Sequence, residues 1–386
     1  SVLDTEAGVR QGAAMKFARD IKVIESIITA GDPAFARVPP NVLDDALLTL
    51  NAQARQADRD AFLLAAMKLV ALAGNGHSRV IPNAAIAVVP RRIVIRDGHP
   101  ALVEDRRTHR ILAVDGIASE QLLTAWDGLL AGNAERRRVL SGIMMAWPAA
   151  LQMAGAGQGK EVCYRLAAGA EYAVSTKDCV PALPLYPVAE TGALDPQRDD
   201  YGLPDGSVLA WRDGLWWWRI GDLKALEEGQ IARGVAQMER RANANIVIDL
   251  RGNPGGSFLK AIPLIDWLRT QWRGTQCAVL VNGYTFSAAI VTAVLVAHHL
   301  GQRARLFGSD MGDHLSFFAE GDTADLLDSG AHLRHSTAWH DWEHGQAAQN
   351  TPDDIAEHLV AAGRLQVEEV AHAAQEQSAL AFAREA

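Results

Sequence analysis

Two glycine-rich segments of the sequence combine open backbone with a reactive hydroxyl group. Residues 251–256 read Arg-Gly-Asn-Pro-Gly-Gly, and residues 282–289 read Asn-Gly-Tyr-Thr-Phe-Ser-Ala-Ala and contain Ser287. Glycine lets a ligand approach backbone N–H groups closely, and such groups stabilise a developing negative charge. A serine hydroxyl beside them could act as the nucleophile of an acyl transfer. Taken alone, however, Ser287 is explained more simply as the N-cap of a helix, and the glycines as a tight turn.

Both segments follow short apolar runs that read as strands of one sheet. Residues 246–250 are apolar on both faces up to Asp249, as in a central parallel strand, and residues 278–281 form the next strand. Helices are expected to alternate with the strands, over residues 225–241, 258–270 and 287–300. Ligands collect at the carboxyl ends of parallel strands, so the two segments are expected to meet there. Residues 207–353 are therefore predicted to form an α/β core with a mixed, mostly parallel sheet and flanking helices.

Together the two segments resemble the signature of the tail-specific, or C-terminal processing, serine peptidases and their relatives with a tricorn-protease type core. Residues 249–256 match the Asp-Leu-Arg-x-Asn-x-Gly-Gly strand end of that family, and residues 287–289 match its Ser-Ala-small element. The resemblance covers roughly residues 211–353 and extends more weakly back to His77. It implies a ClpP/crotonase-like core and a serine endopeptidase that forms an acyl-enzyme on Ser287, without a metal or organic cofactor.

A serine hydroxyl needs a base at neutral pH, and the resemblance implies which residue supplies it. One branch of the family uses a lysine downstream of the serine, but this sequence has no lysine after Lys260. The tricorn-like branch takes a histidine from a loop that follows an N-terminal helical region, and His77 matches that element. It also uses a glutamate near the end of the core, which Glu343 resembles. The resemblance thus implies His77 as general base, supported by Glu343.

Two departures from the family pattern leave the third member of this relay open. Gly76 precedes the histidine where tricorn-like enzymes carry a serine, and Ser78 is an alternative to that serine. Residues 310–314 lie where the lysine branch places its base. The candidates that this segment offers for the relay are Asp310, Asp313 and His314.

Backbone N–H groups would stabilise the oxyanion of the tetrahedral intermediate, by about 3–4 kcal/mol per donor. The expected donors are Gly255, Gly256 and Ala288.

Two other functions stay open. The first is a catalytically impaired peptide-binding module on the same fold, because the relay is incomplete at Gly76. An esterase-like acyl hydrolase is the other, although no Gly-x-Ser-x-Gly elbow surrounds Ser287.

Composition and pattern divide the 386-residue chain into five parts. Short strands separated by Asp-Gly turns at residues 97–98 and 115–116 predict an α+β insert, with features of a degenerate PDZ module. The parts are an N-terminal helical region (1–76), the insert (77–187), a proline-rich connector (188–206), the catalytic core (207–353) and C-terminal helices (354–386).

Charge and hydropathy bear on the partners of the protein. The net charge is −9, without a dense block of lysine and arginine, so nucleic acid is not an expected partner. No apolar run is long enough for a membrane span. The expected partner is a peptide or an unfolded protein segment, and the sequence indicates no oligomeric state. The chain begins at Ser1 without a methionine, which fits a periplasmic or secreted protein whose signal peptide has been removed, the location expected here, and fits a chain trimmed at its N-terminus equally well.

Histidine and cysteine residues are the candidates for metal and disulfide sites. The nearby histidines at positions 332, 335, 340 and 344 lack a His-Glu-x-x-His helix, so no metal site is expected. Cys163 and Cys179 flank a predicted hairpin that could bring them within disulfide range, and two reduced cysteines are the alternative.

Overall fold

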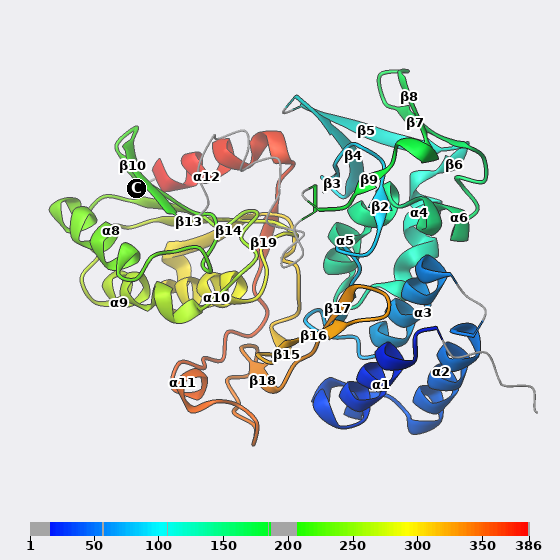
Figure 1. The fold of residues 1–386 in the computed structure, drawn as a ribbon. Helices are drawn as coiled ribbons and strands as arrows, with labels where there is room; N and C mark the ends of the chain where they lie inside the picture. The colour runs from blue at the N-terminus through cyan, green and yellow to red at the C-terminus, as the bar shows by residue number, and fades with distance from the viewer. Residues whose placement is uncertain (1–15, 56–57, 106, 184, 187–206, 385–386) are drawn as a thin grey trace, which may run out of the picture.

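The computed structural model describes residues 16–55, 58–105, 107–183, 185–186 and 207–384. These residues form two lobes, which Figure 1 shows side by side: the N-terminal helices and the insert in one, the core sheet in the other. The proline-rich connector predicted over residues 188–206 lies outside the described residues. No helix in the described ranges is long and apolar enough to cross a membrane.

Three α-helices form the N-terminal part of the first lobe. They are α1 (Ala18–Ser26), α2 (Pro40–Gln53) and α3 (Arg59–Ala71). Asp58 begins α3, because its side chain accepts a hydrogen bond from the Ala61 N–H at 2.8 Å and so satisfies an otherwise unpaired helix donor. Helix α3 buries residues on nearly all sides and is the central helix of this lobe.

The insert folds as an antiparallel sheet with three helices. Its strands are β3 (Ile93–Arg96), β4 (His99–Glu104), β5 (Arg107–Val114), β6 (Ile117–Ala118), β7 (Glu161–Leu166) and β8 (Glu171–Ser175), and its helices are α4 (Ser119–Trp126), α5 (Ala134–Ala146) and α6 (Pro148–Met153). The Asp-Gly turns predicted at residues 97–98 and 115–116 have positive φ at both positions, as tight hairpin turns require. The PDZ-like character of the insert stays a prediction.

The cysteines of the insert are not bonded to each other. Cys163 lies opposite Ala173 in the β7–β8 hairpin, whereas Cys179 lies beyond the end of β8. The hairpin register therefore does not place the two thiols opposite each other, and both are free.

The second lobe is built on a six-stranded sheet. The strand order is β10 (Ser207–Arg212), β11 (Leu215–Ile220), β12 (Ile246–Asp249), β13 (Cys277–Val281), β14 (Ala304–Gly308) and β19 (Val367–Glu369). Only the β10–β11 pair is antiparallel within this sheet, so its strands are mostly parallel. The predicted mixed α/β fold is thereby confirmed, whereas the ClpP/crotonase-like detail stays a prediction.

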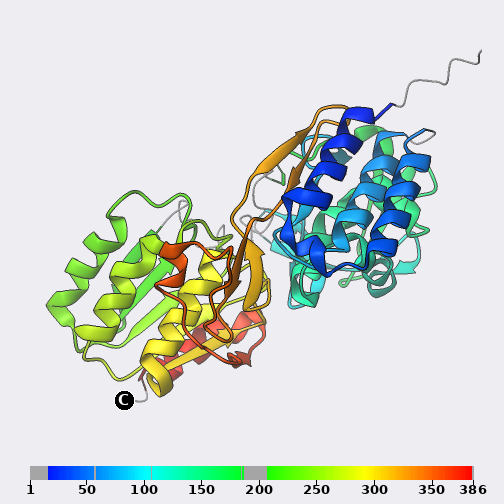
Figure 2. The same cartoon turned by 90° about the horizontal axis from the view of Figure 1, so that it is seen from below.

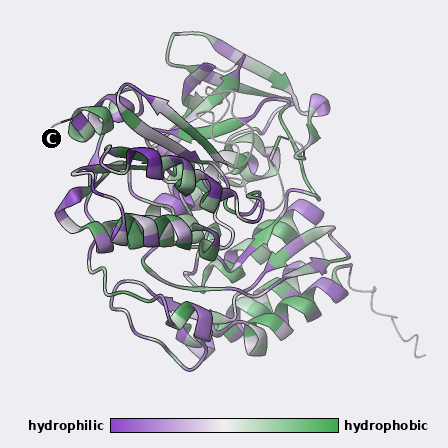
Figure 3. Cartoon of the chain, turned by 90° about the vertical axis from the view of Figure 1, so that its left-hand side faces the viewer, coloured by the Kyte–Doolittle hydropathy of each residue, from purple (hydrophilic) through white to green (hydrophobic). Residues whose placement is uncertain are grey.

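Helices cover both faces of this sheet. Helices α8 (Gln230–Met238), α9 (Ile262–Thr270) and α10 (Ala288–Leu300) pack on one face, and α12 (Gln375–Arg384) packs on the other. Successive strand residues alternate between the faces: Trp216 and Trp218 lie under the three helices, and Trp217 lies under α12. In Figure 3 hydrophilic residues (purple) and hydrophobic residues (green) alternate along the amphipathic helices.

The C-terminal segment differs from its predicted all-helical character. Besides α12 and the single turn α11 (Asp353–Ala356), it supplies β19 at the edge of the core sheet. This strand has only three residues, two of them glutamates, so it lacks the alternation by which a strand is recognised in a sequence.

A hairpin from the core segment reaches into the first lobe. Strands β16 (Thr323–Leu326) and β17 (Ala331–Arg334) pair with each other, and β17 also pairs with β1 (Arg79–Ile81). Strands β15 (Ser316–Ala319) and β18 (Ala338–Asp341) pair at the base of this hairpin. The orange hairpin leaves the second lobe and lies along the first in Figures 1 and 2. Residues distant in sequence from β1 therefore surround the loop before it.

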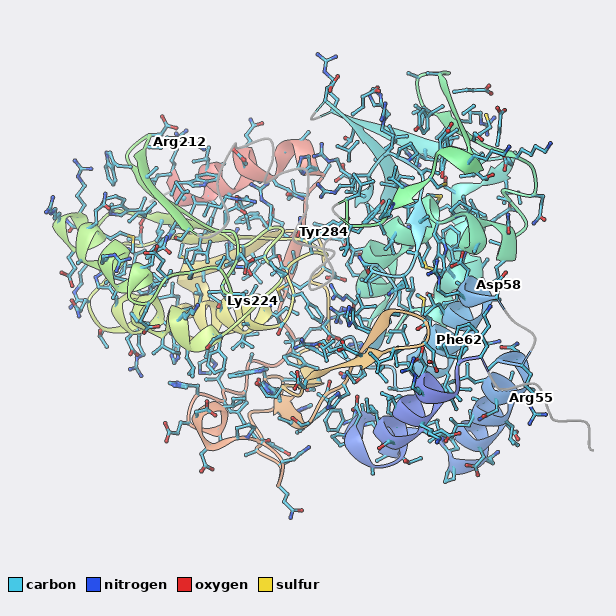
Figure 4. All side chains as sticks on the ribbon, viewed as in Figure 1. Arg55, Asp58, Phe62, Arg212, Lys224 and Tyr284 are labelled. Carbon is cyan, nitrogen blue, oxygen red and sulfur yellow. The ribbon has the colours of Figure 1, made fainter. Side chains whose placement is uncertain are left out.

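A second contact between the lobes involves Tyr284, which lies between them in Figure 4. Its hydroxyl accepts a hydrogen bond from the Ile95 N–H at 2.8 Å. Next to it, Gly283 lies against Glu135 of α5, and a side chain at position 283 would collide with that carboxyl group. Burial raises the pKa of Glu135 to about 7, and the charges of Asp310 and Glu369 act in the same direction.

Glu135→Gln is expected to stabilise the protein at pH 8 but not at pH 4.5. The folded-state pKa of Glu135 is raised, so the wild-type protein loses stability as the pH rises from about 4.5, the unfolded value, through about 7. The amide stays neutral and avoids this loss, which is at most ~3 kcal/mol. Urea unfolding of both proteins at the two pH values measures the difference. Glu120→Gln, at an exposed position of α4, is the control, and an equal Glu135→Gln effect at both pH values would contradict the prediction.

Candidate active site

The loop after β12 is anchored by buried charges. Asp249 is fully buried and pairs with Arg251 at 2.7 Å and with Arg219 at 3.0 Å. Burial alone would raise the pKa of Asp249, but these two guanidinium groups hold it below its usual value. Arg251 also reaches Gln375 and Glu376 of α12, each at 3.2 Å. The charged residues of the motif therefore fix the strand end against α12 and are not free for chemistry.

Hydrogen bonds join this loop to the loop that carries Ser287. The Thr285 hydroxyl donates to the Leu250 carbonyl at 2.9 Å, and the Phe286 N–H donates to the Asn253 carbonyl at 3.0 Å. The Asn282 side chain accepts from the Gly252 N–H at 3.1 Å. The two segments thus meet at the carboxyl edge of the sheet, as their placement after neighbouring parallel strands requires.

Ser287 has a strained backbone and a hydroxyl that does not cap the helix after it. Its dihedral angles are φ 54° and ψ −125°, a region that residues with a Cβ atom rarely adopt, at a cost of about 1–3 kcal/mol. Ser287 precedes α10, yet its side chain makes no capping hydrogen bond. A Cβ atom on Gly255 would lie 2.7 Å from the Cβ of Ser287, so only glycine permits this approach. The N-cap interpretation does not describe Ser287, whose hydroxyl is left half-buried at the loop contact.

The three predicted oxyanion donors differ in their surroundings. The Gly255 N–H donates to the Asn253 side-chain oxygen at 2.9 Å, so it is already engaged within the loop. Gly256 has φ 130° and lies against the backbone of Lys224, in the second lobe of Figure 4. Ala288 is the first residue of α10, where a backbone N–H has no partner within the helix. The Gly255 N–H is thus already used within the loop, whereas the Ala288 N–H has no partner within its helix and lies next to Ser287 in the chain.

His77 lies in the loop between α3 and β1, inside a column of aromatic rings. Its ring stacks on Phe286 at a centroid distance of 4.4 Å and on Phe317 at 5.1 Å. The guanidinium of Arg136 covers Phe286 at 3.6 Å. Because Phe286 directly precedes Ser287, this stack brings the imidazole to the serine loop. Neither ring nitrogen of His77 has a hydrogen-bond partner among the described residues, so the imidazole is not bonded to Ser287.

Asp313 is the carboxylate beside His77. Its Oδ2 lies 3.4 Å from Nδ1 of His77, and both side chains are almost completely buried. Burial lowers the pKa of His77 to about 4, although the Asp313 carboxylate acts to raise it. The imidazole is therefore neutral near pH 7, as a general base must be.

The contact with Asp313 accounts for the glycine before His77. A Cβ atom at Gly76 would lie 2.7 Å from Asp313 Oδ2 and 3.3 Å from the Phe286 ring. The serine that tricorn-like enzymes were expected to carry at this position would therefore collide with the carboxylate. In this chain Asp313 occupies the space that such a serine would need.

The other predicted relay residues are either exposed or hydrogen-bonded to another group. Glu343 follows β18, and its side chain is exposed; its backbone carbonyl accepts a hydrogen bond from the Gly363 N–H. Asp310 and His314 are exposed as well. Ser78 is buried, but its hydroxyl donates to Asp32 at 2.6 Å and is directed into that contact. The structure thus brings Ser287, His77 and Asp313 into one region and leaves Glu343 outside it.

Several residues of this region were not singled out in the sequence. Phe286 and Phe317 hold the imidazole, and Asp32 with Ser336 holds the loop that carries it. Phe286 could have been noticed as the neighbour of the serine. Asp32 and Ser336 are separated by 304 positions, and no local pattern connects them.

The histidines considered for a metal site have separate surroundings. His332 pairs with Asp325, His344 with Asp341, and His340 with Glu320. Among the described residues no group of three or more potential ligands converges.

Comparisons with known proteins identify the fold. No family model matches the sequence, and no curated protein matches it. Mature CPAF aligns over 83% of this chain and 88% of its own, with a TM-score of 0.55 and 12% identity. Mature CPAF complexed with lactacystin aligns over 83% and 89%, with a TM-score of 0.52 and 12% identity. The photosystem II D1 C-terminal processing protease aligns over 96% and 98%, with a TM-score of 0.41 and 13% identity. The likeness to mature CPAF shows the fold of this chain, and it agrees at the level of fold with the family resemblance predicted from the sequence.

Proposed function

We propose that the protein is a serine endopeptidase that hydrolyses peptide bonds through an acyl-enzyme on Ser287. The observation that carries this proposal is the strained Ser287 at the start of α10, with Gly255 against it and a hydroxyl that caps no helix. Strain of this kind persists where the surrounding structure holds a residue for function. The proposal also agrees with the fold that the chain shares with mature CPAF, which has been solved in complex with lactacystin.

His77 would act as the general base. Its Nε2 takes the proton from Ser287 Oγ as that oxygen attacks the scissile carbonyl, and later returns the proton to the leaving amine. The Asp313 carboxylate, near Nδ1, favours the tautomer that carries its proton on Nδ1 and leaves Nε2 free to accept. Catalytic hydrogen bonds are often loose in a free enzyme, so the His77–Ser287 bond would form on substrate binding.

The N–H groups of Ala288 and Gly256 would stabilise the oxyanion. Ala288 lies next to the nucleophile in the chain and at the N-terminus of α10, where the helix dipole also favours negative charge. Water then attacks the acyl-enzyme with His77 as base, releases the second product and restores the Ser287 hydroxyl. None of these steps needs a metal or an organic cofactor. The substrate would be a peptide or an unfolded protein segment.

Active-site labelling of the intact protein tests this proposal. A fluorophosphonate probe is expected to modify the peptide that contains Ser287, located by mass spectrometry, and the protein is expected to cleave members of a peptide library. Ser257→Ala, at an exposed serine just beyond the glycine loop, should label like the wild-type protein. Peptide binding without labelling or cleavage would instead identify a peptide-binding module. Turnover of acyl esters with peptides refused would identify an esterase.

A further inference from the structure

We propose that a buried hydrogen-bond network centred on Asp32 positions the loop that carries His77, so that Asp32 is a positioning residue for the proposed general base. The inference rests on the proposed function. We call the set of residues that form it the Asp32 network: Asp32, Asn75, Ser78 and Ser336.

The Asp32 carboxylate joins three segments of the chain. It is 5% exposed. Its Oδ2 accepts hydrogen bonds from the Ser78 hydroxyl at 2.6 Å and from the Ser336 N–H at 3.0 Å. Its Oδ1 accepts one from the Ala34 N–H at 2.9 Å, at the start of the 3-10 turn Pro33–Arg37. Hydrogen bonds to a buried carboxylate are short and strong, so this group fixes the three segments relative to one another.

Asn75 extends the network to the other side of His77. Its amide nitrogen donates to the Ser78 hydroxyl at 2.8 Å and to the Ser336 hydroxyl at 3.0 Å. Its amide oxygen accepts from the Phe318 N–H at 3.1 Å, and Phe318 follows the Phe317 whose ring stacks on the imidazole. The network therefore holds the chain on both sides of His77 and one of the two rings between which it lies.

Positioning by the backbone matters here because the polar contacts of the imidazole itself are long. Neither of its ring nitrogens is hydrogen-bonded within the described structure, and Asp313 contacts it at 3.4 Å only. The place of the ring thus depends on the aromatic stack, on the Asp313 carboxylate and on the backbone of residues 75–78. A displacement of about 1 Å in a catalytic group can cost 10²-fold in rate. Loosening the loop should therefore appear in the chemical step more than in substrate binding.

Asp32→Asn tests the role of the carboxylate with little change in size. The asparagine amide has one oxygen in place of two. It either turns its NH₂ group toward the Ser78 hydroxyl and the Ser336 N–H, which are both donors, or leaves one of the present donors without an acceptor. We expect kcat for peptide hydrolysis to fall about 10- to 100-fold while KM stays within about twofold. Ser336→Ala is a milder variant, because it removes the hydroxyl bond to Asn75 but keeps the Ser336 N–H bond to Asp32. It should lower kcat a few-fold with KM unchanged.

Asp20→Asn is the matched control. Asp20 is also a fully buried carboxylate in the first lobe, and it accepts hydrogen bonds from the N–H groups of Asp328 and Ser329, at 2.8 Å each. It ties α1 to the turn between β16 and β17, with no hydrogen bond to the His77 loop. The two substitutions should destabilise the protein comparably, but only Asp32→Asn should lower kcat.

A spectroscopic measurement separates this inference from the proposed function. In a Ser287→Ala background, the His77 imidazole NMR signals, assigned by comparison with His77→Gln, should shift in Asp32→Asn and stay unchanged in Asp20→Asn. This result would support positioning even if the protein hydrolysed no peptide. The inference is overturned if Asp32→Asn and Ser336→Ala match Asp20→Asn in kcat and in the His77 signals, because the network would then be structural only.

Discussion

Replacing Ser287 with alanine is expected to lower kcat for peptide hydrolysis by about 10⁶-fold and to abolish fluorophosphonate labelling. The acyl-enzyme cannot form without Oγ, and no other serine is expected to take its place: the hydroxyl of Ser78 is committed to Asp32. Steady-state kinetics with a fluorogenic peptide from the labelling screen measure the loss, and unfolding curves check the fold.

The strained backbone of Ser287 offers a control for this experiment. Alanine has a Cβ atom and keeps the strain at φ 54°, whereas glycine relieves it. Ser287→Gly should therefore be as inactive as Ser287→Ala but more stable, by about 1 kcal/mol. If hydrolysis and labelling survived in both variants, Ser287 would not be the nucleophile. Equal stability of the two variants would show that the strain is small.

The part of the site that could be predicted from the sequence depends on local pattern. A run such as Ile246–Asp249, followed at once by a glycine loop, fixes both a strand and the position of its carboxyl end. The same holds for β13 and the loop before Ser287. Neighbouring parallel strands end at one edge of a sheet, so the contact between the two loops followed from their order in the sequence.

The partners of His77 depend on contacts between distant segments, which spacing does not reveal. The hairpin β16–β17 leaves the second lobe and pairs with β1, and this carries Phe317 and Ser336 to the loop of His77. The sequence pattern predicts no strand over residues 316–341, so it indicates neither the hairpin nor the lobe that the hairpin joins. Asp313 comes to lie beside His77 although 236 positions separate the two residues, and family resemblance alone could only leave several candidates for this partner.

Hydrogen bonding within a loop is equally hidden from the sequence. Gly255 matches the family position for an oxyanion donor, yet its N–H is taken by the side chain of Asn253 two residues earlier. Its other property, the absence of a Cβ atom beside Ser287, explains why glycine is needed. A glycine in a motif can thus be required because it lets another residue come close, while neighbouring residues supply the hydrogen-bond donors for the oxyanion.

The sequence offered both Asp313 and Glu343 as the acidic partner of His77, and the geometry around His77 distinguishes between them. Asp313→Asn is expected to lower kcat about 10²- to 10⁴-fold, since the imidazole loses the carboxylate that orients it and stabilises its protonated form. Glu343→Gln, at an exposed site, should change kcat less than twofold. Kinetics of the two variants with one peptide measure the difference. The reverse order of effects would favour Glu343 as the supporting acid.

The pH dependence of the Asp313 variant provides an independent check on this assignment. A general base works in its neutral form, so kcat/KM of the free enzyme falls as the pH drops through the pKa of His77, which burial sets at about 4. The Asp313 charge raises this pKa against burial, and its removal should therefore move the acid limb to still lower pH. Glu343→Gln should leave the limb in place. An acid limb near pH 6.5 in the wild-type protein would mean that His77 is solvated when it acts, and that the buried ring must move before catalysis.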